Sequence, residues 1–572
     1  MPKTKLLLLN IPLGPFPTTD APVAITRVIE KMDPSLEMEV SFYDIYLETP
    51  SLEDIRRRVE IFAPKIIGFS AILSHNYGYV KRLSLFLKRH FPDVIQVLGG
   101  EMASIANIVV RRTAVDFCVT GESEPTFSEL LRRLKEVDFD LKSREIFKDI
   151  RGLVFLADGE SYFTGYAVEK REVLQINYDI VARFSRLDHY LEPVTGQRFR
   201  KSFNKTEMEN FWTHIHPENR HKRICQVSAS IGCVAKCTFC HRFYKGYTAA
   251  DPESIIDYIE EQVRKYDIGT VNFWEENWGS NKAATKQIVA YLKSRRLNWI
   301  AGATRVSTID EETIREWKEA GCIQIGFGIE TGSQKILDTM EKKTTVKQNV
   351  DALRFCFKHK LITCVLVLLG MPGETEETVD ETIRNLSAAL PEDIQIPYDM
   401  AINFFQAIPG TPGYEYAMRV GLIGPTLDDE ERYLEGLYDV DASSIKHYLN
   451  FTDYEKEEVA YWRRYVLLEI TVNYMRKHGI TNCLRERKAM RYRYALLYMS
   501  MPRPVRRFLL KYFTVVETFG VGGLASLLYR KAFHPRPKRF SDVGESLRRV
   551  NREIPVEVRE DDRNTAILRA GR

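Results

Sequence analysis

The sequence predicts an α/β protein in three parts: a doubly wound N-terminal domain, a partial TIM-like (β/α)6 barrel and a mostly helical C-terminal domain. Three observations carry this prediction. Residues 5–135 alternate short aliphatic runs with helix-like segments, the same alternation resumes from 224 to about 425, and 430–572 are mainly helical and rich in Arg and Tyr. Aliphatic runs between helices are typical of parallel strands that are buried on both faces.

The first domain is expected to hold five strands, in KLLLLN, EVSFYDI, KIIGFSA, VIQVLGG and VDFCVTGE. Each is a short β-branched or aliphatic run, and a helical stretch separates it from the next. The N-terminal run is shorter than the apolar core of a secretory signal, so we expect it to be the first strand. The helices are expected near residues 21–32, 51–62, 77–90, 104–112 and 125–136.

Small and polar residues stand where these strands end. Open parallel sheets bind their ligands at the carboxyl ends of the strands. Residues with little or no side chain there let a large flat ligand approach the backbone. The sequence therefore predicts a binding face formed by Ser70, Gly99, Gly100, Gly121 and Glu122.

The second α/β unit contains about six strand–helix repeats, which fit a partial barrel better than an open sheet, although periodicity alone does not separate the two. Its strands are expected in CQVSASIG, TVNFWEEN, NWIAGAT, IQIGFGIE, ITCVLVLLG and DMAINFFQ. Its helices are expected at 252–266, 281–295, 310–320, 333–339, 346–359 and 375–389.

These patterns divide the chain into five segments. The less regular stretch between the two α/β units includes RGLVFLADGE, which has the pattern of a hairpin. The charged end of the chain has the composition of a disordered tail. We expect a first domain over 1–140, a linker region over 141–220, the barrel over 221–430, a helical domain over 431–545 and a disordered tail over 546–572.

Composition excludes several classes of protein. Hydrophobic residues make up 44% and charged residues 28% of the 572 residues, as in a folded protein with a large core. The net charge of +4 is too nearly balanced to predict a nucleic-acid partner. Nine cysteines in so long a chain are too few for a disulfide scaffold, which favours a cytoplasmic location.

Three cysteines, Cys233, Cys237 and Cys240, form a CxxxCxxC loop after a strand-like segment. Thiolates at this spacing can hold three corners of a [4Fe–4S] cluster, which leaves one iron open to chelate S-adenosylmethionine. The alternative is a zinc site, but structural zinc requires four protein ligands, and the adjacent His241 is poorly placed as a fourth. The spacing therefore predicts a cluster that is held by these three cysteines.

Around this loop the sequence resembles the radical S-adenosylmethionine (SAM) superfamily, whose loop is CxxxCxΦC with an aromatic residue before the last cysteine, here Phe239. Four further segments match the family: TVNFWEENWGSN, RVSTIDEETIREWKEAGCIQIGFGIETGSQKIL, LLGMPGETEET and FFQAIPGTPGYEYA. The resemblance covers roughly 224–425. It implies an enzyme that cleaves SAM to start radical chemistry.

The resemblance also implies roles for individual residues. The three cysteines would hold the cluster, and Phe239 would lie near the adenine of SAM. Glu275 and Glu276 on the acidic loop, and Glu330 in the GIE segment, would line the cofactor or the substrate. Arg305, at a strand end, would reach the carboxylate or ribose of SAM. The alternatives are that these carboxylates cap the following helices and that Arg305 forms a surface ion pair.

In GFSAILSHN, LGGEMAS and VTGESEPTF the first domain resembles the Rossmann-like cobalamin-binding domain of many radical SAM enzymes. The chain lacks the Asp-x-His-x-x-Gly loop that supplies a cobalt ligand in classical cobalamin domains. We expect residues 71–75 under the metal, with Leu73 there if the site is apolar; His75 is the single histidine near this face. The alternative is a flavodoxin-like fold with an empty site.

The segment at about 502–540 mixes apolar and aromatic residues with basic ends. Such a segment suits a helix or hairpin on an anionic membrane surface. Packing against the barrel mouth is the alternative. With membrane contact, the substrate would be lipid-like or a tetrapyrrole. The basic residues are Arg503, Arg506, Arg507, Lys511, Arg530 and Lys531.

Together these features predict a cobalamin-dependent radical SAM enzyme, a C-methyltransferase that acts on an unactivated carbon of a small molecule. Its electrons would come from a donor such as flavodoxin or ferredoxin. The alternative is an oxidative cyclase or rearrangement enzyme without methyl transfer. A tRNA methylthiotransferase would need three further cluster cysteines in its N-terminal domain, and residues 1–140 contain only Cys118. An intact cysteine loop argues against a non-enzymatic cobalamin sensor.

Overall fold

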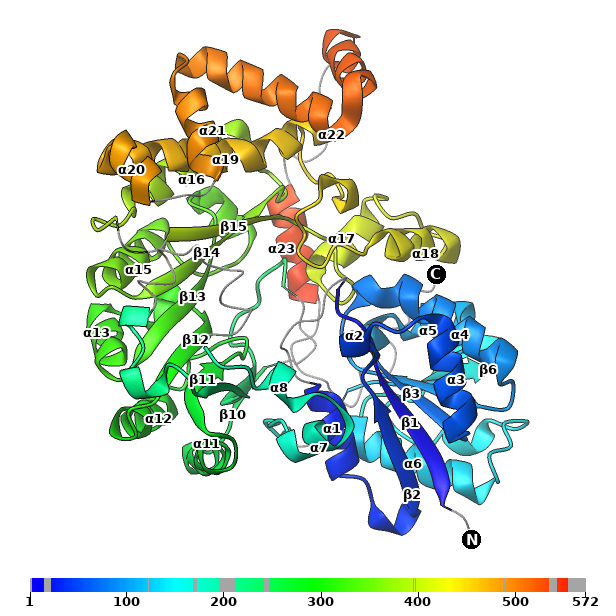
Figure 1. Cartoon of the computed structure of the whole chain (residues 1–572). Helices are drawn as coiled ribbons and strands as arrows, with labels where there is room; N and C mark the ends of the chain where they lie inside the picture. The colour runs from blue at the N-terminus through cyan, green and yellow to red at the C-terminus, as the bar shows by residue number, and fades with distance from the viewer. Residues whose placement is uncertain are drawn as a thin grey trace.

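The computed structural model shows two α/β bodies side by side, with the C-terminal helices stacked on the second (Figure 1). The first body is blue to cyan in the figure and the second is green. The predicted fold class is confirmed. The structure describes residues 3–14, 22–121, 123–167, 172–194, 212–240, 246–394, 396, 398–486, 490–533 and 543–553.

The first body is a seven-stranded sheet in the order β2-β1-β3-β4-β5-β6-β7, whose first five strands are parallel. Along β1 the buried leucines alternate between two cores, with Leu7 and Leu9 on one face and Leu6 and Leu8 on the other. This explains the unbroken leucine run. The strands are β1 (Thr4–Asn10), β2 (Met38–Tyr43), β3 (Ile66–Ser70), β4 (Ile95–Gly99), β5 (Phe117–Val119), β6 (Leu153–Ala157) and β7 (Glu160–Phe163).

Helices cover both faces of this sheet, as a doubly wound domain requires. α3, α4 and α5 contribute to the core on one face, and α1 and α6 to the core on the other. The helices are α1 (Val23–Glu30), α2 (Ile45–Glu48), α3 (Leu52–Phe62), α4 (Tyr77–His90), α5 (Ala106–Arg112) and α6 (Ser123–Glu136).

The hairpin β6–β7 belongs to the first domain, which corrects the boundary that we expected at residue 140. β6 pairs antiparallel with β5 and places Phe155 opposite Phe117. Both phenylalanines are fully buried, so the hairpin completes the core of the first sheet. The predicted hairpin is confirmed, but its strands extend the first sheet and do not belong to a linker region.

Two short helices, α7 (Tyr178–Phe184) and α8 (Leu187–Tyr190), lead from the first body to the second. The carboxylate of Asp44, which is fully buried, accepts hydrogen bonds from the hydroxyls of Ser185 and Tyr190, both at 2.6 Å. A buried carboxylate needs such partners. Asp44 therefore fixes the connecting segment to the first sheet.

The second body is a six-stranded parallel sheet in the order β15-β14-β13-β12-β11-β8, so that consecutive strands along the chain are neighbours. This sequential order is that of a partial (β/α)6 barrel. The strands are β8 (Arg223–Val227), β11 (Ile268–Phe273), β12 (Asn298–Thr304), β13 (Cys322–Glu330), β14 (Ile362–Leu369) and β15 (Tyr398–Phe404), with a small ribbon of β9 (Ser230–Gly232) and β10 (Tyr247–Ala249).

The barrel helices begin at strong sequence signals. In the first of them Pro252 occupies the first helical position, and the side chain of Asp251 accepts a hydrogen bond from the backbone N–H of Ser254 at 3.2 Å. The helices are α11 (Pro252–Tyr266), α12 (Lys282–Ser294), α13 (Glu311–Glu319), α14 (Gln334–Thr339), α15 (Val346–Lys358) and α16 (Glu376–Ala388).

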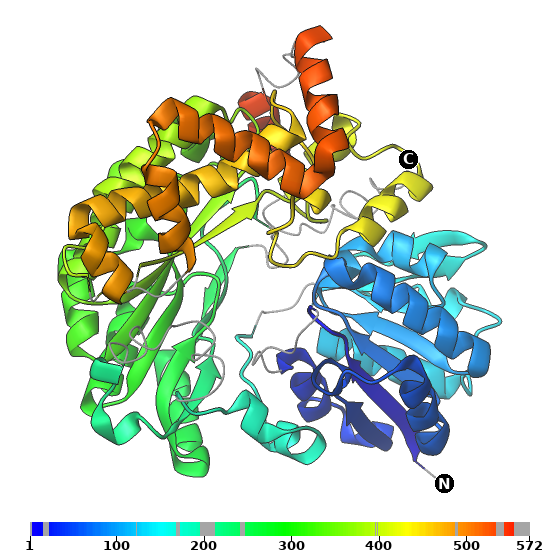
Figure 2. The same ribbon diagram turned by 45° about the horizontal axis from the view of Figure 1, so that its top comes forward.

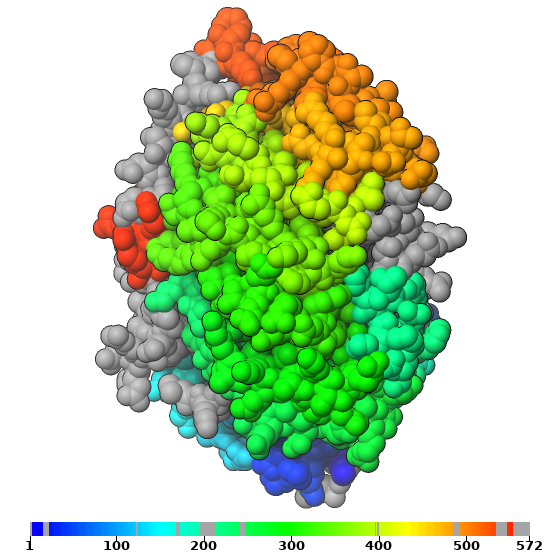
Figure 3. All heavy atoms as spheres, turned by 90° about the vertical axis from the view of Figure 1, so that its left-hand side faces the viewer, coloured from blue at the N-terminus to red at the C-terminus, as the bar shows by residue number. Residues whose placement is uncertain are grey.

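The rest of the described chain is helical, and its orange helices cap one end of the green barrel (Figure 3). α22 lies at the edge of the molecule in both ribbon views (Figures 1 and 2). The helices are α17 (Pro412–Arg419), α18 (Leu427–Gly436), α19 (Lys456–His478), α20 (Ile480–Glu486), α21 (Met490–Met499), α22 (Arg503–Phe533) and α23 (Val543–Glu553).

The last helix corrects part of the disordered tail that we expected over 546–572. Leu547 and Val550 of α23 are buried in the main core, and the side chain of Asn551 donates a hydrogen bond to the carbonyl of Lys236 at 2.7 Å. The apolar pair in an otherwise charged segment stabilises the helix. Residues 554–572 lie outside the described part of the chain.

Candidate cofactor-binding site

The cysteine loop begins at the end of β9, at the carboxyl end of the barrel sheet. Cys233 follows this strand directly, Cys237 is buried and Cys240 is exposed. Between the last two, Thr238 donates from its backbone N–H to the carbonyl of Met340 at 2.9 Å and from its hydroxyl to the carbonyl of Thr339 at 3.2 Å. The loop is therefore anchored to the segment that follows α14.

The donor set of this loop fits a [4Fe–4S] cluster. It offers three thiols, and Cys240 lies within electrostatic range of Cys233 and Cys237. Burial raises the pKa of Cys233, and the neighbouring Cys237 adds to this effect. Among the described residues, no three Cys, His, Asp or Glu side chains converge on a point that would suit one metal ion. A [4Fe–4S] cube binds three thiolates at three separate corners, so the sulfur atoms of its site need not converge on one point. His241 lies outside the described residues.

Two cations stand beside the cysteines. Arg305 has one guanidinium nitrogen 3.9 Å from the Cys237 sulfur and donates a hydrogen bond with the other to the carbonyl of Lys342. Burial disfavours the charged form of Lys342, but Glu330 and Cys237 outweigh it and raise the pKa of this lysine. A charged ammonium and a guanidinium here would stabilise thiolate and cluster charge.

Glu330 forms an ion pair with Lys342, with 2.8 Å between the carboxylate oxygen and Nζ. The same Nζ lies 5.5 Å from the ring centroid of Phe239. Lys342 is 8% exposed and was missed in the sequence, where nothing distinguishes it from the neighbouring Lys343. Lys342, which was not predicted, thus links the two predicted residues Glu330 and Phe239.

The GIE segment has a local geometry that explains its residue types. The pairing of β13 with β14 shifts register between Gly328 and Glu330, and Glu330 has a φ of 63°, which is rare outside glycine. A Cβ atom at Gly328 would lie 2.4 Å from the Glu330 carboxylate and 2.8 Å from the Lys342 Nζ. Glycine at 328 therefore leaves room for the ion pair over the strand. Such backbone strain clusters at functional sites.

Glu275 and Glu276, which we predicted to have the same role on the acidic loop, differ in burial and in hydrogen bonding. Glu275 is buried, accepts a hydrogen bond from the backbone N–H of Ala229 at 3.2 Å, and lies 3.5 Å from the hydroxyl of Ser230. Burial raises the pKa of Glu275 to about 8. Its carboxyl group thus holds the backbone just before the cysteine loop. Glu276, in contrast, is exposed.

Glu276 also faces the first domain. Burial raises the pKa of Glu101, at the end of β4, to about 8, and the charge of Glu276 contributes. Like charges disfavour ionisation when they lie close together. Carboxyl groups from the strand ends of both sheets therefore lie within electrostatic range of each other.

The predicted corrin-binding face is open where the sequence placed small residues. A small cavity of about 50 Å³ lies there, lined by Ser70, Gly99 and Gly100 together with apolar core residues such as Val97 and Phe127. A Cβ atom at Gly99 or Gly121 would meet no atom within 4 Å, whereas one at Gly100, with a φ of 93°, would lie 2.5 Å from the Ala71 carbonyl oxygen. The absence of neighbouring atoms at Gly99 and Gly121 would let a flat ligand approach the backbone there. Glu122 lies outside the described residues.

The two candidates for the lower face of the corrin differ in their surroundings. Leu73 is half-buried. His75 is buried and its Nε2 lies 3.0 Å from the side-chain oxygen of Gln406, which follows β15 of the barrel. Burial lowers the pKa of His75. This histidine joins the strand ends of the two sheets.

Comparison with known families matches both bodies. The B12 binding domain model matches residues 22–131, and the Radical SAM superfamily model matches residues 227–386. The chain is a radical SAM protein with a B12-binding domain. A [4Fe–4S] cluster, SAM and cobalamin are its cofactors.

Relatives of this radical SAM protein include an uncharacterized methyltransferase, PH0819, of Pyrococcus horikoshii, which is 27% identical over 426 residues, 71% of this chain and 83% of the relative. An anaerobic magnesium-protoporphyrin IX monomethyl ester cyclase of Cereibacter sphaeroides is 25% identical over 60% of this chain and 52% of its own length. The structure of the radical SAM methyltransferase TsrM of Kitasatospora setae, at 18% identity, has a TM-score of 0.55 over 74% of this chain and 77% of TsrM, a shared fold.

Proposed function

We propose that this radical SAM protein is a cobalamin-dependent methyltransferase that acts on an unactivated carbon of a small-molecule, lipid-like or tetrapyrrole-like intermediate. One observation carries the proposal. The strand ends of the two cofactor domains meet through the His75–Gln406 hydrogen bond, and the Glu101 and Glu276 carboxyl groups lie within electrostatic range of each other. Two reactive groups that are held face to face in one chain react without diffusion. Relatives that are named methyltransferases support this function.

When bound, the cluster with one SAM supplies a radical that removes hydrogen from carbon, and cobalamin supplies a methyl group that it takes from a second SAM. We propose that Cys233, Cys237 and Cys240 hold the cluster. The positive charges of Arg305 and Lys342 stabilise the negative charge of thiolates and of the SAM carboxylate. Glu275 acts as a positioning residue, because its carboxyl group holds the backbone ahead of Cys233.

The remaining predicted residues are assigned by their position. Phe239 and Glu330 lie beside Lys342, and Glu276 lies within electrostatic range of Cys233 and Cys240. All three would bind SAM or the substrate. The His75–Gln406 bond turns the histidine toward the barrel, which favours an apolar contact such as Leu73 at the lower face of the corrin. The corrin would lie on Ser70, Gly99, Gly100, Gly121 and Glu122.

The similarity to anaerobic cyclases supports one alternative function, that of an oxidative cyclase or rearrangement enzyme that transfers no methyl group. The mass of the product separates the two reactions. A gain of one methylene per turnover supports methylation, and a loss of hydrogen without that gain contradicts it. The substrate candidates to test first are lipid-like and tetrapyrrole-like molecules.

Anaerobic reconstitution tests the catalytic proposal. The protein loaded with iron and sulfide is expected to hold about four irons per chain and, with dithionite and SAM, to release deoxyadenosine. Cys237→Ala is expected to abolish this release, and Cys225→Ala, at a fully buried cysteine on β8, serves as the matched control. Unchanged deoxyadenosine release from Cys237→Ala would contradict the assignment.

We further propose a cytoplasmic location, an electron donor such as flavodoxin or ferredoxin, and peripheral contact with the inner surface of a membrane through about 502–540. The exposed apolar surface of α22 supports the membrane contact. The described part of the chain contains one helix, α22, long and apolar enough to cross a membrane by length and composition.

A further inference from the structure

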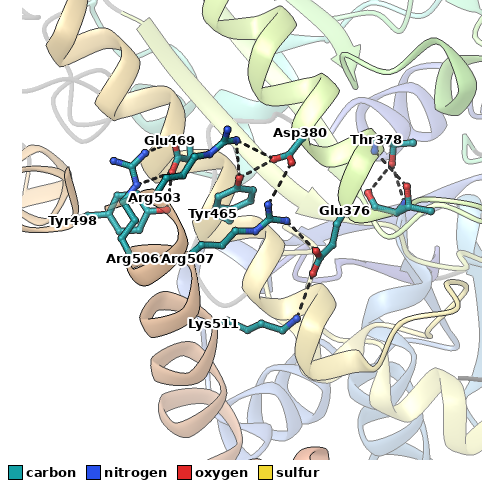
Figure 4. Close-up of polar contacts among 11 residues, drawn as sticks. Glu376, Thr378, Asp380, Tyr465, Glu469, Tyr498, Arg503, Arg506, Arg507 and Lys511 are labelled. Carbon is teal, nitrogen blue, oxygen red and sulfur yellow. Dashed lines mark hydrogen bonds and ion pairs between the residues drawn. The ribbon is translucent and has the colours of Figure 1, made fainter. Parts of the chain in front are cut away.

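Two basic side chains near the start of α22, those of Arg506 and Arg507, point into the protein. The guanidinium of Arg506 donates to both carboxylate oxygens of Glu469 in α19, at 3.1 and 2.9 Å (Figure 4). Both side chains are almost completely buried. The next residue, Arg507, pairs with Glu376 at 3.0 Å and with Asp380 at 3.4 Å, both in α16. These contacts fasten the helix to the side of the barrel.

The other basic residues named in the sequence have the same role. Each one forms an ion pair with an acidic side chain of α16 or of the region around the start of α19 (Figure 4 shows Arg503 and Lys511). Their charge is thereby compensated within the protein, which agrees with the alternative that this segment packs against the protein and leaves less charge to attract anionic lipid. The pairs are Arg503–Asp380 at 3.6 Å, Lys511–Glu458 at 2.7 Å, Arg530–Glu457 at 2.6 Å and Lys531–Glu458 at 2.8 Å.

The opposite face of α22 is apolar and exposed. Phe508 is 60% exposed, Phe513 63% and Val521 72%. Glu517 is the one exposed acid of the helix and pairs with Arg464. The most apolar 18-residue window of this helix is only 11% buried, whereas a core helix of equal hydropathy would be mostly buried. The other large exposed side chains are Val505, Leu509, Val516, Leu528, Tyr529 and Phe533.

The backbone of α22 breaks at Gly520, where φ is 73° and ψ is 179°. The break leaves two arms of about 17 and about 13 residues, roughly 26 and 20 Å long at 1.5 Å per residue. A bilayer core is about 30 Å thick, so neither arm crosses it. The second arm also turns away from the first (Figures 1 and 2). The geometry is that of a helix that lies in a surface.

We infer that the outer face of α22 inserts into the boundary between headgroups and acyl chains of a bilayer, through apolar contact and without a requirement for anionic lipid. This inference rests on the membrane contact proposed above, and it specifies the apolar boundary region of the bilayer as the part that α22 contacts. A bilayer fits better than a second copy of this chain or another protein, because protein interfaces carry a polar rim. Apart from Glu517, which pairs with Arg464, the exposed side chains from Phe508 to Val521 are aromatic or aliphatic.

Flotation with vesicles tests this inference on the full chain. The protein is expected to float with vesicles of neutral phosphatidylcholine, and to bind equally well when salt is raised from about 0.1 M to about 1 M, because screening weakens charge attraction but not apolar burial. Phe508→Ser combined with Phe513→Ser is expected to lower the bound fraction at least about tenfold. Ile61→Ser, at an exposed isoleucine of α3, is the matched control and is expected to change nothing.

Two outcomes would overturn the inference. Binding only to vesicles with anionic lipid, lost at high salt, would show that charge and not apolar contact drives it. No binding, together with self-association that the double substitution abolishes, would show that a second copy covers this face. Flotation does not use the reaction, so a failure of methyl transfer leaves this result intact, and the converse also holds.

Discussion

The buried ion pair between Arg506 and Glu469 makes the strongest prediction for stability. Side-chain exposures of 3% and 5% leave both groups almost without water, and Tyr498 donates a further hydrogen bond to the same carboxylate at 2.8 Å. The Arg506 guanidinium also lies 4.9 Å from the centre of the Tyr498 ring. Arg506→Met removes the cation and leaves a buried, uncompensated carboxylate. Such a loss costs about 3 to 5 kcal/mol.

The measurement is hydrogen exchange of α19 and α22, because unfolding of a chain with several domains is not a single transition. A cost of about 3 to 5 kcal/mol raises the local opening constant roughly a hundredfold to several thousandfold. Replacing both partners, Arg506→Met with Glu469→Leu, is expected to restore most of the protection, because no buried charge is left.

An exposed pair on the same helices is the control. Arg464 and Glu517 are 38% and 50% exposed, so Arg464→Met is expected to cost about 1 kcal/mol or less. If Arg506→Met raises exchange no more than Arg464→Met does, the buried pair does not hold α22, and the reasoning is refuted.

Three further predictions follow from single positions. Gly99→Leu is expected to leave the melting temperature within a few degrees but to lower cobalamin binding at least about tenfold, because its side chain enters open space; Gly436→Leu, also in open space, is the control. Burial raises the pKa of Glu374 to about 8, above its ordinary 4.5, so the contribution of this carboxyl group to stability is lost as the pH rises from about 4.5 to about 8. Glu374→Gln is expected to make the fall in stability over this range smaller in a thermal-melting series. Glu431→Leu removes the carboxylate that pairs with Lys81 at 2.7 Å, and faster proteolysis between the domains is the expected result.

The sheets and most helix bounds could be predicted from the sequence, because aliphatic runs and capping residues act locally. The hairpin β6–β7 shows the limit. Its pattern was visible, but the pairing of Phe155 with Phe117 joins residues far apart in the chain. Antiparallel additions to a parallel sheet depend on which edge is free, and that edge is set by tertiary structure.

The sequence motifs predicted the cysteine loop of the candidate site, but not the contacts of the residues around it. The three cysteines stand on one loop, but the difference between Glu275 and Glu276 depends on which carboxyl group meets the Ala229 backbone. Lys342 lacks a distinguishing signal because its role comes from burial beside Glu330. Charge in the sequence was likewise misleading for α22, because spacing does not reveal that Arg506 faces Glu469.

The most direct test of the central claim, that the two domains carry cofactors that work together, follows one methyl group. Protein reconstituted with a cluster and reduced cobalamin is mixed with SAM that carries a deuterated methyl group, and the corrin is then extracted for mass spectrometry. The account predicts a deuterated methyl group on the corrin from the wild type and its loss in Gly99→Leu. Unlabelled corrin from wild-type protein that holds both cofactors would contradict it.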